Sequence, residues 1–318
     1  MLLINEEEVR ALLPVAACVD VLDQLFADAG AGKAAVMGRQ RIPLPQGTHQ
    51  IMGGTSESFE ATGLKTYVGV AGGGGTQMVV LLFGTGSPEP VAMIAANALG
   101  QIRTGAASGV ATRHMAKPNA STVGIIGSGY QARTQLAAVW AARPITQAWV
   151  YSRSSERREA FADDMSEELG IAITATDTPE AAVRDAAIVC VITNAREPVV
   201  DGDSFSAGVH INAAGSNSWA RRELDETAVR RSNLVVVDDL AQAKMEAGDL
   251  IWAAERRAFH WEQAVELGDV VVGRVLGRPH ADAITLFESQ GIGTEDVAAG
   301  MYVYRRAQEQ GLGREVAL

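Results

Sequence analysis

The sequence contains few cysteines, few aromatic residues and fewer basic than acidic residues. Its 318 residues include two cysteines, Cys18 and Cys190, and neither belongs to a CxxC motif or a Cys/His cluster. Both lie in apolar stretches, so we predict buried, reduced thiols rather than a disulfide framework. The formal net charge of -11 argues against a surface that binds polyanions, and we expect no nucleic-acid partner.

The N-terminus also lacks the features of a signal peptide. Three consecutive glutamates, Glu6 to Glu8, stand where a signal peptide needs basic residues, and no apolar run approaches the ~18 residues of a membrane span. We therefore expect a cytoplasmic protein with no membrane partner. The length and the 47% of hydrophobic residues predict two globular domains with ordinary cores.

Alternating β segments follow an N-terminal helical region. Asn5 is placed to cap the first helix, and apolar residues at helical spacing continue to about Gly30. From Arg39 onward, RIPLP, HQIMGGTS, LKTYVGV, QMVVLLF and VAMIAA predict a β meander. No helix or Lys-Ser/Thr follows the run Gly72 to Gly75, so we interpret it as a hairpin tip rather than a phosphate loop.

The stretch STVGIIGSGYQART, residues 121–134, predicts a strand, a glycine turn and a helix. Gly127 permits a sharp turn, Gly129 lets the backbone approach a pyrophosphate, and Ala132 keeps the helix close to the strand. The helix N-terminus adds free N–H groups and a partial positive charge. Glycine turns follow strands in many α/β proteins, but this spacing favours a dinucleotide site over a plain turn.

Strands and helices then alternate as far as about residue 294. This order predicts an α/β fold with a Rossmann-type, doubly wound parallel sheet over residues 118–294. Residues 1–117 and 295–318 would form a second, discontinuous α+β domain. Its last element is a helix, TEDVAAGMYVYRRAQEQ, which we expect to return to the N-terminal domain with no strand after it.

The end of the second Rossmann strand favours NADP(H) as the cofactor. This strand ends at Tyr151 and is followed by Ser152, Arg153 and Ser154. An acidic residue at this point favours NAD, whereas a cation flanked by hydroxyls matches a 2′-phosphate. We therefore predict that Arg153 binds the 2′-phosphate of NADP(H) and is not a surface arginine without a role. NAD(H) is the alternative cofactor.

Several separated motifs resemble the ornithine cyclodeaminase and mu-crystallin family. They are GLKTYV, IRTGAASGVAT, GIIGSGYQA, HINAAGSNSWARRELD, DDLAQAKMEAGD and ITLFESQGIGTEDVAA, and they cover nearly the whole chain. The resemblance implies a nicotinamide-binding Rossmann domain and a second domain for substrate binding and dimerisation, whose strands form a homodimer interface. It also implies a small amino acid or imino acid as substrate.

The resemblance implies roles for several residues whose function the residue types alone do not decide. Arg41, Lys65 and Arg103 are cations in apolar stretches, which by themselves fit either structural ion pairs or a substrate clamp. In the family they imply binding of a substrate carboxylate, with Gln290 near the substrate. The residues predicted around the cofactor, from the motif and the resemblance together, are Thr104, Gly127, Gly129, Tyr130, Gln131, Ser152, Arg153, Ser154, Thr193, Ala213, Gly215, Arg221 and Ser289.

One departure from the family pattern favours reduction over deamination. The cyclodeaminase branch carries an aspartate as proton donor and acceptor where this chain has Asn217. An amide hydrogen-bonds a substrate but does not exchange a proton at a useful pKa. We therefore predict NADPH-dependent reduction of a cyclic ketimine, such as pyrroline- or piperideine-2-carboxylate. Lys65 would assist protonation and Asn217 would orient the imine.

Two alternatives stay open. The first is a deaminating enzyme of the same family, an ornithine cyclodeaminase or an alanine-type amino-acid dehydrogenase, in which Lys65 or Asp225 replaces the missing aspartate. The second is a crystallin-like protein that binds the cofactor without turnover. The presence of Arg41, Lys65 and Arg103 together argues against this second alternative.

The sequence gives no support to a metal site. Glu246 and Asp249 in KMEAGD belong to a motif of the family, yet no histidine stands at metal-ligand spacing from them. We interpret these two residues as helix caps.

Overall fold

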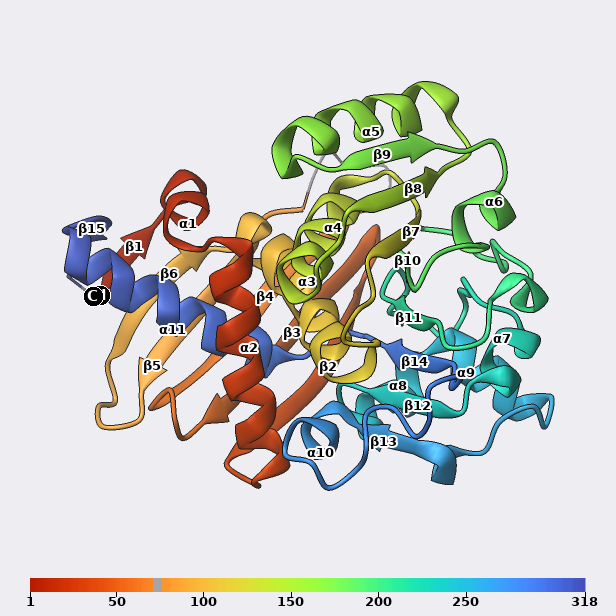
Figure 1. Ribbon diagram of the computed structural model, residues 1–318. Coiled ribbons are helices and arrows are strands. Elements are labelled where there is room, and N and C mark those ends of the chain that lie inside the picture. The colour runs from red at the N-terminus through yellow and green to blue at the C-terminus, as the bar shows by residue number, and fades with distance from the viewer. Residues whose placement is uncertain (71–75, 318) are drawn as a thin grey trace. The chain divides into compact units, whose positions relative to one another are not determined.

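The chain divides into two compact units in the computed structural model, which describes residues 1–70 and 76–317 (Figure 1). The first unit contains Met1–Arg103 and Gly291–Leu318, and the second contains Thr104–Gln290. The domain boundaries expected at residues 117/118 and 294/295 stay predictions. The hairpin tip predicted at residues 72–75 lies outside the described residues.

The first unit is built on a mixed sheet. Its strand order, for the part of the chain that is described, is β15-β1-β6-β5-β4-β3-β2. The strands are β1 (Leu2–Ile4), β2 (Ala34–Leu44), β3 (Gly47–Ser56), β4 (Ala61–Val70), β5 (Met78–Gly84), β6 (Pro90–Ala95) and β15 (Arg314–Glu315). Strands β2 to β6 pair antiparallel in chain order, which confirms the predicted meander. The expectation that no strand follows the last helix was wrong, because β15 pairs with β1.

Helices cover one face of this sheet. They are α1 (Glu6–Leu12), α2 (Val15–Gly30) and α11 (Gly293–Gln310), and α3 (Asn97–Met115) begins in this unit. Asn5 caps α1 through a capping box, as predicted. The helix α11 contacts β3, β4, β5 and α2, and Figure 1 shows it in blue across these strands.

One row of residues shows which face the helices cover. Met52, Lys65, Val80 and Ile94 are direct partners across β3, β4, β5 and β6, so their side chains share a face. All four are buried. Lys65 is therefore a cation in an otherwise apolar row under α11, and its burial requires an anionic partner.

The second unit is built on a parallel sheet with the order β13-β12-β14-β11-β10-β7-β8-β9, counted over the described residues. The strands are β7 (Thr122–Ile126), β8 (Gln147–Tyr151), β9 (Ala172–Ala175), β10 (Ile188–Val191), β11 (His210–Ala213), β12 (Leu234–Val237), β13 (Ala264–Glu266) and β14 (Thr285–Glu288). The helices are α4 (Tyr130–Ala142), α5 (Ser155–Leu169), α6 (Pro179–Val183), α7 (Glu226–Arg231), α8 (Leu240–Glu246), α9 (Gly248–Glu255) and α10 (Leu267–Val271).

Residues of β10 alternate between two hydrophobic cores, one on each face of this sheet. Ile188 and Cys190 pack with residues of α4 and α5, whereas Val189 and Val191 pack with residues of α6, α7 and α9. A strand buried on both faces is typical of a doubly wound sheet. The predicted α/β class and Rossmann-type sheet are confirmed.

None of the helices in the described part of the chain is long and apolar enough to cross a membrane. The expected cytoplasmic location stays a prediction.

Candidate active site

The glycine turn after β7 has the geometry that a bound pyrophosphate requires. Gly127 has a φ of 113°, and a Cβ there would lie 2.2 Å from the Ile192 carbonyl oxygen. At Gly129 a Cβ would meet nothing within 4 Å, so the space beside this backbone is open. Gly129 is the N-cap of α4 and offers no side-chain cap to the helix N–H groups. A phosphate group fits the N–H groups at such a helix start.

Two predicted cofactor residues open α4. Tyr130 is its first residue and is exposed. The amide oxygen of Gln131 is buried and has no hydrogen-bond partner among the described residues. A buried polar atom of this kind calls for a partner, and a bound ligand at the turn would supply one. The residues present at this turn therefore fit a dinucleotide.

The turn after β8 carries Arg153 on an ordered loop. The Ser128 hydroxyl donates to Ser152 Oγ at 2.8 Å, which ties this loop to the glycine turn. Ser154 accepts the Arg157 N–H at 3.3 Å and caps α5, so its hydroxyl is already engaged in the fold. Arg153 between them is exposed and stands at the position that reads the adenosine ribose.

The carboxyl ends of β10, β11, β12 and β14 bring together the next group of predicted residues. Thr193 follows β10, Ala213 ends β11, and Gly215 follows it. Ser289 follows β14, and its backbone N–H donates to the Ala213 carbonyl at 2.9 Å. Ligands of doubly wound sheets bind at this edge, so Thr193, Ala213, Gly215 and Ser289 stand where a cofactor contact is expected.

Glu223 is a residue of this edge that sequence reasoning missed. Its carboxylate accepts the backbone N–H groups of Thr193 at 2.5 Å and Gly215 at 2.7 Å. Burial, with the nearby Asp249 carboxylate, raises the pKa of Glu223 to about 8. The expectation that Asp249 caps a helix was wrong, because its Oδ1 accepts the N–H groups of Glu223 and Leu224 from another segment.

Three further predicted residues lie outside these strand ends. Asn217 and Arg221 are exposed in the segment between β11 and α7. Thr104 lies within α3, and its carbonyl oxygen accepts the Gln135 side-chain amide at 3.2 Å. Their cofactor and substrate roles stay predictions.

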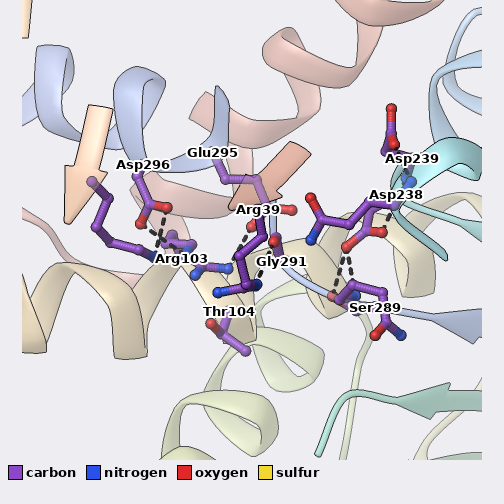
Figure 2. A network of polar contacts seen from close by, with 12 residues as sticks. Arg39, Arg103, Thr104, Asp238, Asp239, Ser289, Gly291, Glu295 and Asp296 are labelled. Atoms are coloured by element: carbon purple, nitrogen blue, oxygen red, sulfur yellow. Dashed lines mark hydrogen bonds and ion pairs between the residues drawn. The ribbon is translucent and has the colours of Figure 1, made fainter. Parts of the chain in front are cut away.

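Gln290 is buried at the end of the second unit. Its backbone N–H donates to Asp238 Oδ2 at 2.7 Å, and its side-chain amide donates to Glu288 Oε1 at 3.2 Å. The Ser289 hydroxyl also donates to Asp238 Oδ2, at 3.3 Å (Figure 2). Asp238 therefore fixes the backbone that follows β14.

In the first unit, five charged residues form one buried group, which we call the Lys65 cluster: Arg39, Lys65, Arg103, Glu295 and Asp296. The Lys65 ammonium lies 2.7 Å from Asp296 Oδ2. Arg103 donates from Nε to Asp296 Oδ1 at 3.0 Å and from Nη1 to Glu295 Oε2 at 2.8 Å (Figure 2). Both carboxylates come from the first turn of α11.

Burial and the neighbouring charges shift the pKa values of Lys65 and Asp296. Burial lowers the pKa of Lys65 to about 7, with a further contribution from the Arg103 charge and against the opposing effect of Asp296. Burial alone would raise the pKa of Asp296, but Arg103 and Lys65 outweigh it and hold that pKa below its ordinary value. Lys65 therefore exchanges a proton near neutral pH, whereas Asp296 stays ionised.

The structure places Arg39, and not the predicted Arg41, with Lys65. Two residues of β2, Gly38 and Arg39, stand opposite the single residue Met52, because the register shifts between Met37 and Gln40. Arg39 precedes Gln40, which pairs with Ile51, so the Arg39 side chain lies on the same face as Met52 and its partner Lys65. Its guanidinium donates to Tyr67 Oη at 2.8 Å and to the Gly291 carbonyl at 3.1 Å.

Arg41 has a different environment. Its side chain is exposed on β2, whereas that of Arg39 is buried. The predicted role of Arg41 in substrate binding stays a prediction. Arg39 and Arg41 share one face of β2 by alternation, and they differ in burial, which the local sequence pattern does not reveal.

Within residues 1–70 and 76–317, no group of three or more His, Cys, Asp or Glu side chains is arranged to hold a metal ion.

The comparisons with known proteins agree over nearly the whole chain. The sequence model described as "Ornithine cyclodeaminase/mu-crystallin family" matches residues 1–311. A Delta(1)-pyrroline-2-carboxylate reductase of Bacillus cereus is 34% identical, over 99% of both chains.

Two solved structures have the same fold. The Thermococcus litoralis Delta(1)-pyrroline-2-carboxylate reductase, solved in complex with NADH and L-proline, matches with a TM-score of 0.94 and 34% identity over 99% of this chain and 100% of that one. An archaeal alanine dehydrogenase dimer with bound NAD also matches with a TM-score of 0.94, at 27% identity over 100% of this chain and 99% of that one.

Proposed function

The chain belongs to the ornithine cyclodeaminase/mu-crystallin family, and we propose that it reduces a cyclic ketimine that carries a carboxylate beside the C=N bond. Pyrroline-2-carboxylate is the first candidate and piperideine-2-carboxylate the second. Both similar proteins at 34% identity are named as reductases of pyrroline-2-carboxylate, which supports this substrate class.

The Lys65 cluster is the observation that carries the proposal. Three cationic side chains stand with two carboxylates, so the cluster has one net positive charge when Lys65 is protonated. A single substrate carboxylate would neutralise this buried charge. We assign this contact to Arg39, since a guanidinium can bind a carboxylate through two parallel hydrogen bonds.

Lys65 is suited to the proton transfer that accompanies reduction. With a pKa of about 7, its ammonium can donate a proton to the imine nitrogen at neutral pH, or hold the protonated imine by hydrogen bonding. A bound nicotinamide cofactor supplies the hydride that reduces the C=N carbon. The product is a cyclic secondary amine, an amino acid such as proline.

Asn217 and Gln290 are proposed as the polar contacts to the substrate. Neither can act as a proton donor and acceptor at a useful pKa, which favours reduction over removal of an α-amino group. Asp225 is a poor substitute for the missing aspartate. It caps α7 by accepting the Ala228 N–H at 2.7 Å and also accepts the Gly202 N–H at 3.1 Å.

An amino-acid dehydrogenase is the second candidate. The fold match to the archaeal alanine dehydrogenase favours it. Its substrate in the reductive direction is also an imine beside a carboxylate, so the same cluster would serve. The distinction lies in whether ammonia is a reactant, because a cyclic imine carries its own nitrogen.

NADPH is proposed as the preferred cofactor on the strength of the turn after β8. Arg153 is exposed there, and the turn Tyr151-Ser152-Arg153-Ser154 offers no carboxylate to bind the ribose hydroxyls. The similar structures contain NADH or NAD, so the coarser class, a nicotinamide dinucleotide, has the stronger support.

A homodimer is proposed from the uncovered face of the mixed sheet. Ile42, His49 and Val68 are partners across β2, β3 and β4, and Leu44, Gly47 and Val70 form the next row on the same face. Ile42, Leu44, Val68 and Val70 are exposed apolar residues. Exposed apolar side chains gathered on one face of a sheet are typical of a protein interface, and a second copy of the chain would cover them with its own equivalent face.

The decisive experiment measures oxidation of NADPH and NADH with purified full-length protein and a panel of imines. Pyrroline-2-carboxylate and piperideine-2-carboxylate should be turned over, and pyruvate with ammonia should not. In the reverse direction, proline should reduce the oxidised cofactor, while ornithine and alanine should release no ammonia. If pyruvate with ammonia were the only substrate pair turned over, the protein would be an amino-acid dehydrogenase and not a reductase of cyclic ketimines. No turnover of any substrate would favour a cofactor-binding protein.

A further inference from the structure

A buried carboxylate joins the turns that follow two neighbouring strands of the parallel sheet. Glu223 Oε1 accepts the backbone N–H of Thr193, after β10, and Glu223 Oε2 accepts that of Gly215, after β11. We call this arrangement the Glu223 bridge. Strands β10 and β11 are adjacent in the sheet, so the bridge fixes the two turns relative to each other.

The sequence of the second turn is adapted to the bridge. A Cβ on Gly215 would lie 2.3 Å from Glu223 Oε2, 2.4 Å from Oε1 and 2.4 Å from the Thr193 carbonyl oxygen. All three distances are shorter than real Cβ contacts, so any larger residue at this position would displace the carboxylate or the turn. Gly215 is therefore required by the bridge, independently of any ligand.

A second layer holds Glu223 in place. Asp249 Oδ1, from the first turn of α9, accepts the backbone N–H groups of Glu223 at 2.7 Å and Leu224 at 2.8 Å. The other oxygen of Asp249, Oδ2, and Glu288 Oε2, at the end of β14, are both buried and have no hydrogen-bond partner among the described residues. Burial, with the Asp249 charge, raises the pKa of Glu288 well above its ordinary value.

The topology assigns these turns to one half of a dinucleotide. In a doubly wound sheet the pyrophosphate lies at the switch point, here between β7 and β10, and the two halves of the ligand extend to opposite sides. The turn after β8 reads the adenosine side, so the turns after β10 and β11 face the nicotinamide side.

We propose that Glu223 is a positioning residue for the nicotinamide half of the cofactor. It holds the turns at Thr193 and Gly215 in the conformation that receives this half, and it does not touch the reacting atoms. The inference rests on the proposed use of a nicotinamide dinucleotide, and it adds a residue outside the predicted cofactor contacts.

Substitution of Glu223 by glutamine tests the proposal. An amide group has nearly the same shape, but one of its ends is a donor and would face a backbone N–H instead of accepting from it. The dissociation constants of NADPH, NADH and adenosine 5′-diphosphate are measured by titration calorimetry on the full-length protein. We expect at least a tenfold weaker binding of the dinucleotide and less than a twofold change for ADP, which has no nicotinamide half.

Two further variants complete the experiment. Glu226→Gln makes the same chemical change three residues away on α7, where the side chain pairs with Arg222 and Arg256, and should leave all three constants unchanged. Glu223→Asp keeps the carboxyl group but is one methylene shorter and reaches only one turn. This variant should also bind the dinucleotides more weakly with little change for ADP. It replaces the glutamine variant in the experiment if that variant does not fold.

The outcomes are distinct from those of the proposed function. Equal loss of ADP and dinucleotide binding would overturn the inference, because it would show a general structural role. Unchanged binding in both Glu223 variants would also overturn it. Failure of the wild-type protein to bind either dinucleotide would instead remove the proposed function itself.

Discussion

The Lys65 ammonium and the Asp296 carboxylate form an ion pair of 2.7 Å in which both side chains are buried. Lys65 comes from the centre of a β meander and Asp296 from the first turn of the last long helix. Arg103 binds the other oxygen of the same carboxylate. Asp296 therefore holds two cations together on the covered face of the sheet and is the residue on which the geometry of the cluster depends.

The pH dependence of turnover should report the ionisation of Lys65. Its pKa is lowered to about 7, so the ammonium, which is the proton donor, is lost as pH rises through that value. We expect kcat/KM for ketimine reduction to fall by about tenfold per pH unit above pH 7. Oxidation of the amine product needs the neutral form, so its kcat/KM should rise up to about pH 7 and level off above that value.

Removal of Lys65 provides the matching control. Lys65→Ala should lower kcat/KM by about 10²- to 10⁴-fold and abolish the decrease of kcat/KM above pH 7. Lys33→Ala, which removes an exposed lysine of the same unit, should change neither. A profile that stays flat to pH 9 in the wild-type protein would exclude Lys65 as the acid.

Separate alanine substitutions of Arg39 and Arg41 should distinguish which arginine binds the substrate carboxylate. Loss of a charge-assisted hydrogen bond costs about 1.5–3 kcal/mol, so Arg39→Ala should lower kcat/KM for the imine by roughly ten- to a hundredfold. The buried position of Arg39 beside Tyr67 is the reason for this expectation. A larger effect from Arg41→Ala, measured by steady-state kinetics, would return the role to the residue predicted from sequence.

Cofactor preference should depend on Arg153. Arg153→Ala removes the only cation proposed to bind the 2′-phosphate, so kcat/KM with NADPH should fall by roughly tenfold or more while that with NADH stays the same. Arg157→Ala, an exposed arginine on α5, is the control and should leave the ratio unchanged. Equal efficiency of the wild-type protein with both cofactors would contradict the assignment.

The free energy of unfolding should depend on pH because of the raised pKa of Glu223. Its pKa is about 8 in the folded protein against an ordinary value of 4.5, so the folded state keeps a proton that the unfolded state loses. The resulting stabilisation is fully present below about pH 4.5 and is lost as pH rises to about 8. The free energy of unfolding of the wild type, measured in urea relative to Glu223→Gln, should therefore decrease between these values. An unchanging difference would contradict the raised pKa.

The apolar face of the mixed sheet should control the oligomeric state. Val68→Glu places a charge at the centre of this face, and we expect the molar mass measured by light scattering to halve. Leu276→Glu makes the same change at an exposed leucine of the second unit and should not affect the mass. A monomeric wild-type protein, or an intact dimer of the Val68 variant, would rule out this face as the interface.

The features that local pattern determines were predictable from sequence. Period-two alternation predicted the meander, and the glycine spacing after β7 predicted a turn whose Gly127 indeed has positive φ. Lys65 could be singled out because a cation between apolar residues needs a partner. Its partner Asp296 could not be named, since the pairing depends on how α11 packs on the sheet.

The residues that sequence reasoning missed depend on irregular or distant structure. Arg39 and Arg41 alternate onto the same face of β2, and the packing of the folded chain buries the first and leaves the second exposed. Glu223 acquires its role from two turns that precede it in the chain, and only the glycine at position 215 leaves a trace of that contact. Tertiary contacts of this kind have no periodic signal.

The bulge in β2 makes the length of this strand more important than its composition. With pairing fixed from Gln40 to Leu44, the extra residue keeps Met37 on the same face as Ile42 while Arg39 turns to the other. Loss of one residue between Met37 and Gln40 would invert the facing of every earlier position in the strand. We expect natural variants of this chain to accept many substitutions in β2 but no single-residue deletion in the bulge, because one such event would turn Met37 and every residue before it to the opposite face of the sheet.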